Sequence, residues 1–227
     1  MKQTVAAIYT SQALVIPVSD AFPELVPGVR LVNIADDSLI QDVIAANEVP
    51  PAVERRLLRY FMACEDLGAD LILNTCSSIG EASMRIARYI NLPIMNIDDA
   101  MAGAVVQEVG TVAVLATLPS TLGPTVRLIR QHAESAGVTI EIIEGLAPGA
   151  FEALISGDAA KHDQILLETA CRIARNAEAV VLAQGSMARM HAVLESNAGV
   201  KVFSSIRSGL ASVHARLTES SARVPNV

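Results

Sequence analysis

The chain has 227 residues, of which 52% are apolar and 18% are charged, and its formal net charge is −7. The apolar content is ample for a hydrophobic core and excludes a disordered chain. No run approaches the ~20 consecutive apolar residues that a membrane-spanning helix needs, so no membrane partner is expected. The acidic balance, with three Tyr, four Phe and no Trp, argues against a nucleic-acid partner.

The three cysteines are irregularly spaced and do not predict a disulfide framework. The sequence contains neither a Cys-x-x-Cys pair nor a His-x-x-x-His pair, so no metal site is expected. The apolar N-terminal stretch is interrupted by Thr10, Ser11 and Gln12 and lacks a clean cleavage site. We therefore expect a first strand and a loop rather than a secretory signal, in a cytoplasmic protein.

Short β-branched runs alternate with longer segments of helical pattern along the chain. Most of the runs are continuously apolar, which is typical of strands buried on both faces of a parallel sheet. The strand candidates are residues 4–9, 29–34, 71–73, 93–97, 111–116, 138–143, 179–183 and 200–203. The main helix candidates are residues 53–67, 81–90, 125–136, 161–176 and 205–218. This alternation predicts an α/β fold built from right-handed βαβ units.

The order of the strand candidates repeats once along the chain. Residues 5–10 resemble 112–117 at an offset of 107, and residues 94–95 resemble 202–203 at 108. Two further matches, 29–34 with 138–143 and 71–73 with 180–182, have an offset of 109. The repeat predicts two pseudo-symmetric halves, each a four-stranded parallel sheet flanked by helices.

The predicted halves have defined limits. We place the first half at residues 1–98 plus a C-terminal helix at 206–227, and the second half at residues 99–205. Ligands of open α/β sheets bind beyond the carboxyl ends of the strands. We therefore expect the functional site in a cleft between the two halves.

The segment from Leu71 to Glu81 combines an apolar strand, a short polar stretch and a helix start. Ser78 and Glu81 have the spacing of a capping box, which predicts Ser78 as the N-cap. Cys76 then follows a strand and precedes a helix N-terminus, whose N–H groups and dipole favour a thiolate and lower its pKa. We select Cys76 as the catalytic candidate, against the alternative of a small apolar packing residue.

Other polar residues near the predicted strand ends are candidates for binding a substrate carboxylate or stabilising an enolate oxygen. Hydroxyl residues at helix starts are first of all N-caps, but helix N-termini also bind anions. The binding candidates of the first half are Ser11, Asn74, Thr75 and Ser77. Those of the second half, where Cys76 falls opposite Gln184 or Gly185, are Thr117, Ser120, Thr121, Gln184, Gly185 and Ser186.

Four further residues receive structural interpretations. Cys64 and Cys171 fall inside helical patterns beside apolar neighbours and are interpreted as core residues. Asp98 and Asp99 open a helix, where acidic residues are ordinary partners of the helix dipole.

No Walker loop and no Gly-x-Gly-x-x-Gly motif occurs, so a nucleotide is not expected and no cofactor is predicted.

The histidines do not favour a serine nucleophile. His132, His162 and His214 occupy polar helix positions and are expected to be solvated. Ser186 and His191 are five residues apart, a separation that turns two side chains of a helix well away from each other. A serine-dependent hydrolase is therefore kept only as a remote alternative.

The stretch Asn74-Thr75-Cys76 after a buried strand, with Val-Leu-Ala-Thr at 114–117 opening the second half, resembles the aspartate/glutamate racemase superfamily. That superfamily includes aspartate, glutamate and hydantoin racemases, maleate cis–trans isomerase and arylmalonate decarboxylase. The resemblance covers the whole chain through its length, strand order and duplication. It implies a cofactor-independent enzyme of two α/β halves that hold the substrate carboxylate between them. In the racemases two cysteines act on opposite faces of the α-carbon, and the resemblance assigns the first of them to Cys76.

Two departures from the family pattern bear on the reaction. The second cysteine normally falls in a Gly-Cys step, and here residues 183–186 read Ala-Gln-Gly-Ser. The acidic residue that often follows the first strand is replaced by Thr-Ser-Gln at 10–12. Glutamine and serine do not serve as general bases at neutral pH without help. The chain is therefore identified as an atypical member that lacks the second cysteine.

We expect a cofactor-independent racemase or isomerase that acts next to the carboxylate of a small acid, with Cys76 as acid/base or nucleophile. The alternatives are a single-cysteine decarboxylase of a malonate-type acid and a non-catalytic small-carboxylate binding protein. A pKa of the Cys76 thiol well below ~8.5 favours catalysis, and an ordinary or raised pKa favours binding or structure. A homodimer or higher homo-oligomer is expected, because duplicated α/β proteins commonly pair their subunits.

Overall fold

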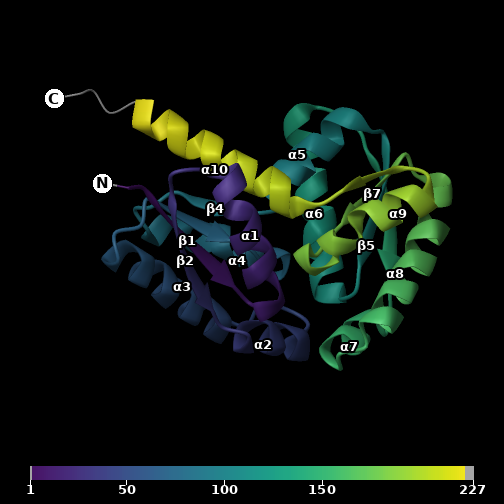
Figure 1. The fold of residues 1–227 in the computed structure, drawn as a ribbon, viewed down its shortest axis with the longest axis horizontal. Helices are drawn as coiled ribbons and strands as arrows, with labels where there is room; N and C mark the ends of the chain where they lie inside the picture. The colour runs from purple at the N-terminus through teal and green to yellow at the C-terminus, as the bar shows by residue number, and fades with distance from the viewer. Residues whose placement is uncertain (1, 223–227) are drawn as a thin grey trace. The chain divides into compact units, whose positions relative to one another are not determined.

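The chain divides into two compact units in the computed structural model, which describes residues 2–222. Unit 1 contains the residues up to Asp98 and the described residues from Ile206 onward, and unit 2 is Asp99–Ser205. Each unit is built on one four-stranded, all-parallel sheet, ordered β2-β1-β3-β4 in unit 1 and β6-β5-β7-β8 in unit 2. The ribbon of the chain is drawn in Figure 1. The predicted α/β class, with two sheets of four parallel strands, is confirmed.

Unit 1 alternates strands with helices. Its strands are β1 (Thr4–Tyr9), β2 (Arg30–Ala35), β3 (Leu71–Asn74) and β4 (Ile94–Asn96). Its helices are α1 (Val15–Leu25), α2 (Ser38–Ala46), α3 (Pro51–Asp66), α4 (Gly80–Ile86) and most of α10 (Ser205–Ala222). Three short 3-10 helices complete it: η1 (Gln12–Leu14), η2 (Ser77–Ile79) and η3 (Ala87–Tyr89).

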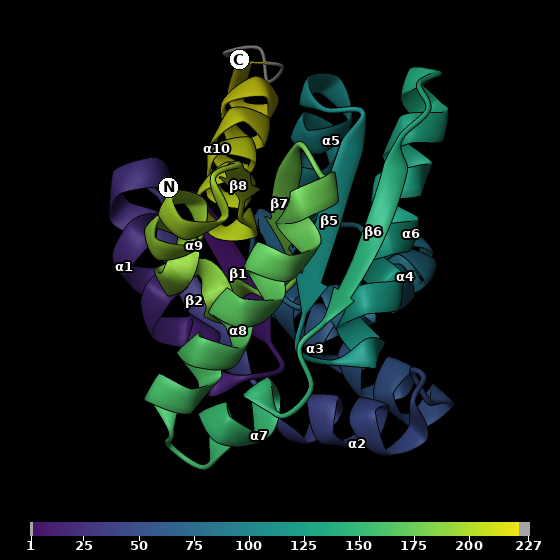
Figure 2. The ribbon, with the colours of Figure 1, turned by 90° about the vertical axis from the view of Figure 1, so that its right-hand side faces the viewer.

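Unit 2 has the same alternation. Its strands are β5 (Thr111–Ala116), β6 (Glu141–Leu146), β7 (Ala179–Leu182) and β8 (Lys201–Phe203). Its helices are α5 (Asp99–Glu108), α6 (Pro119–Ala136), α7 (Ala150–Ile155), α8 (Ala159–Ile173) and α9 (His191–Ala198). The 3-10 helices η4 (Ala174–Asn176) and η5 (Gly185–Met190) flank β7. Figure 2 shows α8 in front of the sheet of this unit and α6 behind it.

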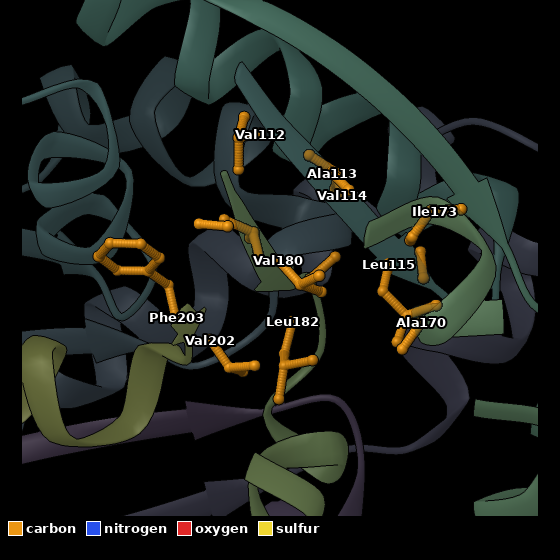
Figure 3. Close-up of a cluster of buried hydrophobic side chains, with 14 of the residues drawn as sticks. Val112, Ala113, Val114, Leu115, Ala170, Ile173, Val180, Leu182, Val202 and Phe203 are labelled. Atoms are coloured by element: carbon orange, nitrogen blue, oxygen red, sulfur yellow. The ribbon is translucent and has the colours of Figure 1, made fainter. Parts of the chain in front are cut away.

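The central strands form the hydrophobic cores because helices cover both faces of each sheet. Every residue of β1, β3 and β7 is buried, whereas the edge strands β2 and β6 contain exposed positions. In unit 2, Leu115 of β5 and Leu182 of β7 belong to one buried cluster with Ala170 and Ile173 of α8 (Figure 3). A separate cluster fills unit 1 and includes Phe61 of α3. The sheets are thus rigid supports for the loops that follow them.

The C-terminal helix belongs to the first sheet. Arg207 of α10 donates to Glu24 of α1 at 2.6 Å, and the two helices lie on the same side of unit 1 (Figure 1). Gly209 lies so close to the backbone after β4 that an added Cβ would be 2.3 Å from the carbonyl oxygen of Ile97. A glycine is therefore required where α10 crosses this part of the chain.

The predicted elements agree with the structure in position and type, with differences at their ends. Strands β1 and β5 have the predicted limits. Strand β6 begins at Glu141 rather than at 138, because Gly137 ends α6 in the left-handed conformation and the residues that follow it connect the helix to the strand. Helix α6 begins at Pro119 rather than at 125, since proline is favoured at the first helical position. In the described part of the chain, no helix is long and apolar enough to span a membrane.

Candidate active site at the carboxyl end of the first sheet

Cys76 lies immediately beyond the carboxyl end of β3. The strand ends at Asn74, and Cys76 has extended backbone angles (φ −122°, ψ 114°) as the N-cap of η2. The residue as a whole is half-buried, with its sulfur on the buried side. Ser78 is not the N-cap of α4 as predicted, because it lies inside η2 and the N-cap position of α4 is Ile79. The chain passes through a 3-10 turn before the α-helix begins.

Three hydrogen bonds are made to the Cys76 sulfur. The Thr10 hydroxyl, which follows β1, donates to it, and so do the backbone N–H groups of Ser78 and Ile79. The thiol therefore lies in a turn whose donors converge on the sulfur. Each of these bonds stabilises the thiolate relative to the thiol.

The pKa of the Cys76 thiol is nevertheless raised above its ordinary value. Burial is the largest cause, because it disfavours the charged thiolate, and the nearby Asp98 carboxylate raises the pKa further. The bonds from Thr10, Ser78 and Ile79 oppose this rise without cancelling it. The predicted lowering of the pKa is therefore wrong: the sequence pattern identifies the donors but not the burial of the sulfur.

Asn74 and Thr75 use their side chains to build the loop. The buried Asn74 accepts from the N–H of Cys76 at 3.2 Å through Oδ1 and donates to the carbonyl oxygen of Cys76 at 3.0 Å through Nδ2. The Thr75 hydroxyl, also buried, donates to the carbonyl oxygen of Ile8 at 2.9 Å. Both residues lie beside Cys76 at the end of β3, as predicted. Their side chains, which were candidates for binding a substrate carboxylate, instead hold the backbone around Cys76.

Ser11 and Ser77 flank this group of residues. Ser11 is the N-cap of η1, and its hydroxyl accepts from the N–H of Ala13 at 3.3 Å. Ser77 is the first residue of η2 and is half-buried. Both lie in the loops that leave β1 and β3, which are neighbours in the sheet.

The sequence does not reveal the contacts that two residues make in this region. Asn96, the last residue of β4, accepts from Asn74 Nδ2 at 2.9 Å. Asp98 is 4% exposed and acts on Cys76 through its charge, whereas only Asp99 lies in the first turn of α5. Asp98 directly precedes α5, so its interpretation as a partner of the helix dipole stays a prediction, and its effect on Cys76 is additional. The register of the sheet could have revealed both, because Asn74 pairs with Asn96 at adjacent strand ends.

In unit 2, Thr117 and Gln184 form a pair of their own. Gln184 Oε1 accepts from the Thr117 N–H at 2.7 Å and from its hydroxyl at 3.0 Å, and Gln184 Nε2 lies 2.8 Å from the same hydroxyl oxygen. Thr117 is 6% exposed and Gln184 is half-buried. The loops after β5 and β7 are thus joined by side chains.

The strand register gives the position in unit 2 that corresponds to Cys76. Val5 pairs with Leu71 in unit 1, and Val112 pairs with Ala179 in unit 2. Leu71 therefore corresponds to Ala179, rather than to 180 as the repeat predicts, and Cys76 corresponds to Gln184. Gln184 is likewise the N-cap of a 3-10 helix with extended backbone angles (φ −127°, ψ 133°).

The remaining candidates of unit 2 lie in two places. Ser120 and Thr121 are in the first turn of α6; Thr121 is buried, and the buried Oγ of Ser120 has no hydrogen-bond partner among the described residues. Gly185 and Ser186 are half-buried in η5, directly after Gln184. The first pair follows β5 and the second pair follows β7, and these two strands are adjacent in the sheet.

The other cysteines differ from each other. Cys64 is buried in the core of unit 1, as predicted, and burial raises the pKa of its thiol to about 11. Cys171 is half-buried, so its interpretation as a core residue is wrong. It lies on the side of α8 where its sulfur is 3.7 Å from the carbonyl oxygen of Asn197.

The histidines do not form a catalytic pair with a serine. His191 contacts the hydroxyl of Ser204 at 3.1 Å through Nδ1. His162, which was expected to be solvated, is completely buried, with Nδ1 2.8 Å from Asp163 Oδ1. Asp163 in turn accepts from Arg189 at 2.7 Å, so Nδ1 of His162 is paired, whereas its buried Nε2 has no hydrogen-bond partner among the described residues. In the described residues, no group of three or more His, Cys, Asp or Glu side chains is arranged to hold a metal ion.

The protein consists of two α/β units, each with a parallel four-stranded sheet. In one unit a cysteine lies in a hydrogen-bonded turn beyond the third strand. These features define a class of duplicated α/β proteins with a thiol site. The model of the Asp/Glu/hydantoin racemase family matches residues 8–213. The chain belongs to this family. No curated protein sequence matches it.

Solved structures of racemases share the fold. Glutamate racemase from Francisella tularensis, in complex with D-glutamate, has a TM-score of 0.75 at 13% identity, covering 100% of this chain and 85% of that one. Aspartate racemase from Picrophilus torridus has a TM-score of 0.72 at 14% identity, covering 97% and 94%. Allantoin racemase from Klebsiella pneumoniae has a TM-score of 0.70 at 15% identity, covering 96% and 89%. At these identities the likeness concerns the fold.

Proposed function

We propose that the protein is a cofactor-independent racemase or isomerase acting at the carbon next to the carboxylate of a small acid, such as an amino acid or a derivative. The observation that carries the proposal is the Cys76 sulfur, which receives hydrogen bonds from Thr10, Ser78 and Ile79 beyond β3. Membership of the Asp/Glu/hydantoin racemase family supports it. Cys76 is the residue to which we assign proton transfer.

The raised pKa of Cys76 determines whether the thiol or the thiolate is the main form that takes part in proton transfer. At neutral pH the thiol is the main form, and its small thiolate fraction accepts the α-proton of the substrate in the exchange reaction; the thiol formed in this way returns a proton to the enediolate. When a carboxyl group leaves as CO₂ instead, the neutral thiol donates its proton to the enediolate directly. The same three hydrogen bonds then stabilise the thiolate that remains. This favours an acid/base role over nucleophilic attack on the substrate.

The test is α-proton exchange in D₂O, followed by NMR, on enantiopure amino acids, hydroxy acids, hydantoin-type acids and malonates. We expect the wild type to exchange the α-proton of at least one compound. Cys76→Ala should reduce this exchange by about 100-fold or more, because general acid–base catalysis contributes about 10²–10⁴-fold. Cys171→Ala, which removes the other half-buried thiol, is the control and should exchange normally. Full exchange by Cys76→Ala contradicts the proposal.

Gln184 favours a second candidate, a single-cysteine decarboxylase of a malonate-type acid. It occupies the position in unit 2 that corresponds to Cys76, and a carboxamide does not exchange protons at neutral pH. One proton carrier delivers a proton to one face of the α-carbon. Release of CO₂ from a malonate, with deuterium on a single face of the product, distinguishes this reaction from racemisation.

A non-catalytic small-carboxylate binding protein is the third candidate, and the raised pKa of Cys76 favours it. Saturable NMR shifts without exchange of any compound identify it. The carboxylate-binding residues of both units, the homo-oligomeric state and the cytoplasmic location stay predictions. Size-exclusion chromatography with light scattering tests the oligomeric state.

A further inference from the structure

The Cys76 loop is closed by one buried amide. Asn74 Oδ1 accepts from the N–H of Cys76 at 3.2 Å, and Asn74 Nδ2 donates to the carbonyl oxygen of the same residue at 3.0 Å. The amide of Asn74 thus bonds both polar groups of the Cys76 backbone. Asn74 itself is 0% exposed.

The side-chain amide of Asn96 connects Asn74 to the start of α4. Asn96 Oδ1 accepts from Asn74 Nδ2 at 2.9 Å, and Asn96 Nδ2 donates to the carbonyl oxygen of Gly80 at 3.3 Å. A Cβ added to Gly80 would lie 3.4 Å from Asn96 Nδ2, so the helix start packs directly on this amide. The two asparagines therefore hold the turn at Cys76 and at Gly80, its two ends.

Unit 2 provides an internal comparison, because the same strand ends carry no asparagine. By the register of the two sheets, Asn74 corresponds to Leu182 and Asn96 corresponds to Ser204. Leu182 is 0% exposed, and Ser204 contacts His191 on α9 at 3.1 Å. A buried amide is harder to accommodate than a leucine unless it is hydrogen-bonded. The fold thus does not require the asparagine pair, which occurs in the unit with the thiol.

We propose that Asn74 and Asn96 are positioning residues for the reaction, which fix both ends of the turn from Cys76 to Gly80. Held at both ends, the turn directs two of its N–H groups at the sulfur. Asn74, expected from the sequence to bind substrate, acts through the geometry of Cys76 instead. The role in turnover rests on the proposed function, whereas the effect on the thiol does not.

The test replaces the pair by its counterparts from unit 2, in Asn74→Leu, Asn96→Ser and the double variant. Alkylation of Cys76 by iodoacetamide is followed by peptide mass spectrometry from pH 6 to 11. We expect the midpoint of the Cys76 reaction to rise by about one pH unit in the double variant, because misdirected N–H donors stabilise the thiolate less. On a substrate found by the exchange panel, kcat should fall about tenfold or more, with KM changed by less than about threefold.

The controls separate positioning from general loosening of the fold. Asn33→Ser removes another asparagine of unit 1, one that bonds Tyr9 and Ser19, and should leave the Cys76 midpoint unchanged. Buried Cys64 reports on opening of the fold, and its alkylation should stay slow in every variant. If Asn74→Leu does not fold, Asn96→Ser still removes the link to Gly80.

An unmoved Cys76 midpoint in folded Asn96→Ser and double variants overturns this inference. So does a midpoint that moves equally in Asn33→Ser. Absence of exchange on every compound contradicts the proposed function instead, and in that case the alkylation midpoints still decide whether the asparagines position the thiol.

Discussion

Thr117 and Gln184 are joined at the end of the second sheet in the way that Thr10 and Cys76 are joined at the end of the first. In both units a threonine after the first strand bonds the residue that precedes a 3-10 helix. The partner is a titratable thiol in unit 1 and a carboxamide in unit 2. The duplicated loops have thus kept their geometry while their chemistry differs.

Gln184→Leu should destabilise the protein by about 1–3 kcal/mol, because it leaves the buried Thr117 N–H and hydroxyl without their partner. Urea unfolding monitored by circular dichroism gives the change in the free energy of unfolding. Gln164→Leu alters an exposed glutamine of α8 and should stay within about 0.5 kcal/mol of the wild type. Equal stability of the two variants would show that the Thr117 bonds contribute nothing.

Gly209→Ala should destabilise the protein by about 1–3 kcal/mol, since the new Cβ would lie 2.3 Å from the carbonyl oxygen of Ile97, a backbone atom that cannot rotate away. Gly103→Ala is the matched control inside α5. Its Cβ meets only His132, at an ordinary 3.5 Å, so helix propensity should make it neutral or stabilising by up to ~1 kcal/mol. Thermal unfolding of both variants is the measurement, and a stabilised Gly209→Ala protein contradicts the packing of α10.

Asp36 makes the stability of unit 1 dependent on pH. Burial acts to raise the pKa of its carboxyl, but hydrogen bonds from Ser38 and Tyr60 and the charge of Arg56 outweigh it and hold the pKa below the ordinary value. A carboxylate with a lowered pKa stabilises the fold above the unfolded pKa of ~3.9, and this contribution is lost as the pH falls through the folded value.

Asp36→Asn should therefore lower the free energy of unfolding by about 1–2 kcal/mol at pH 7, through loss of charged hydrogen bonds. The difference from the wild type should shrink when both proteins are unfolded in urea at pH 3. Asp37→Asn, at the neighbouring position, is the control for a change of net charge. A difference that stays constant from pH 7 to pH 3 would contradict the assigned role of Asp36.

The two thiols of unit 1 should react differently. Cys64 is completely buried, whereas Cys76 is half-buried, so iodoacetamide should reach and modify Cys76 first in the native protein. Peptide mass spectrometry after timed alkylation gives both rates. In denaturant the difference should disappear, because it depends on burial. Faster native modification of Cys64 would contradict the packing of α3.

The sequence predicts the strands because their apolar runs directly reflect burial on both faces of each sheet. It also identifies the Cys76 segment, since a polar stretch after an apolar run indicates a strand end. It does not reveal the raised pKa of Cys76, which depends on burial by elements distant in sequence. The same limit applies to His162, whose helix position is polar in the sequence although the side chain is buried beside Asp163.

Asn96 and Asp98 show a second limit. Neither belongs to a recognisable motif, and each acquires its contacts only because β3 and β4 are paired in one particular register. Pairing of predicted strand ends, before interpretation of single residues, would have brought Asn74 and Asn96 together.

The return of α10 to the first sheet has a consequence for synthesis on the ribosome. Unit 2 is one continuous segment, whereas unit 1 needs residues on both sides of it. Domains fold as units while the chain emerges, so unit 2 can complete its core before Gly209 and Arg207 have left the exit tunnel. The first sheet, although made first, acquires its last covering helix only at the end. Chains that end at Ser205 and have been released from the ribosome should therefore protect the second sheet from proteolysis and leave the first one open to it.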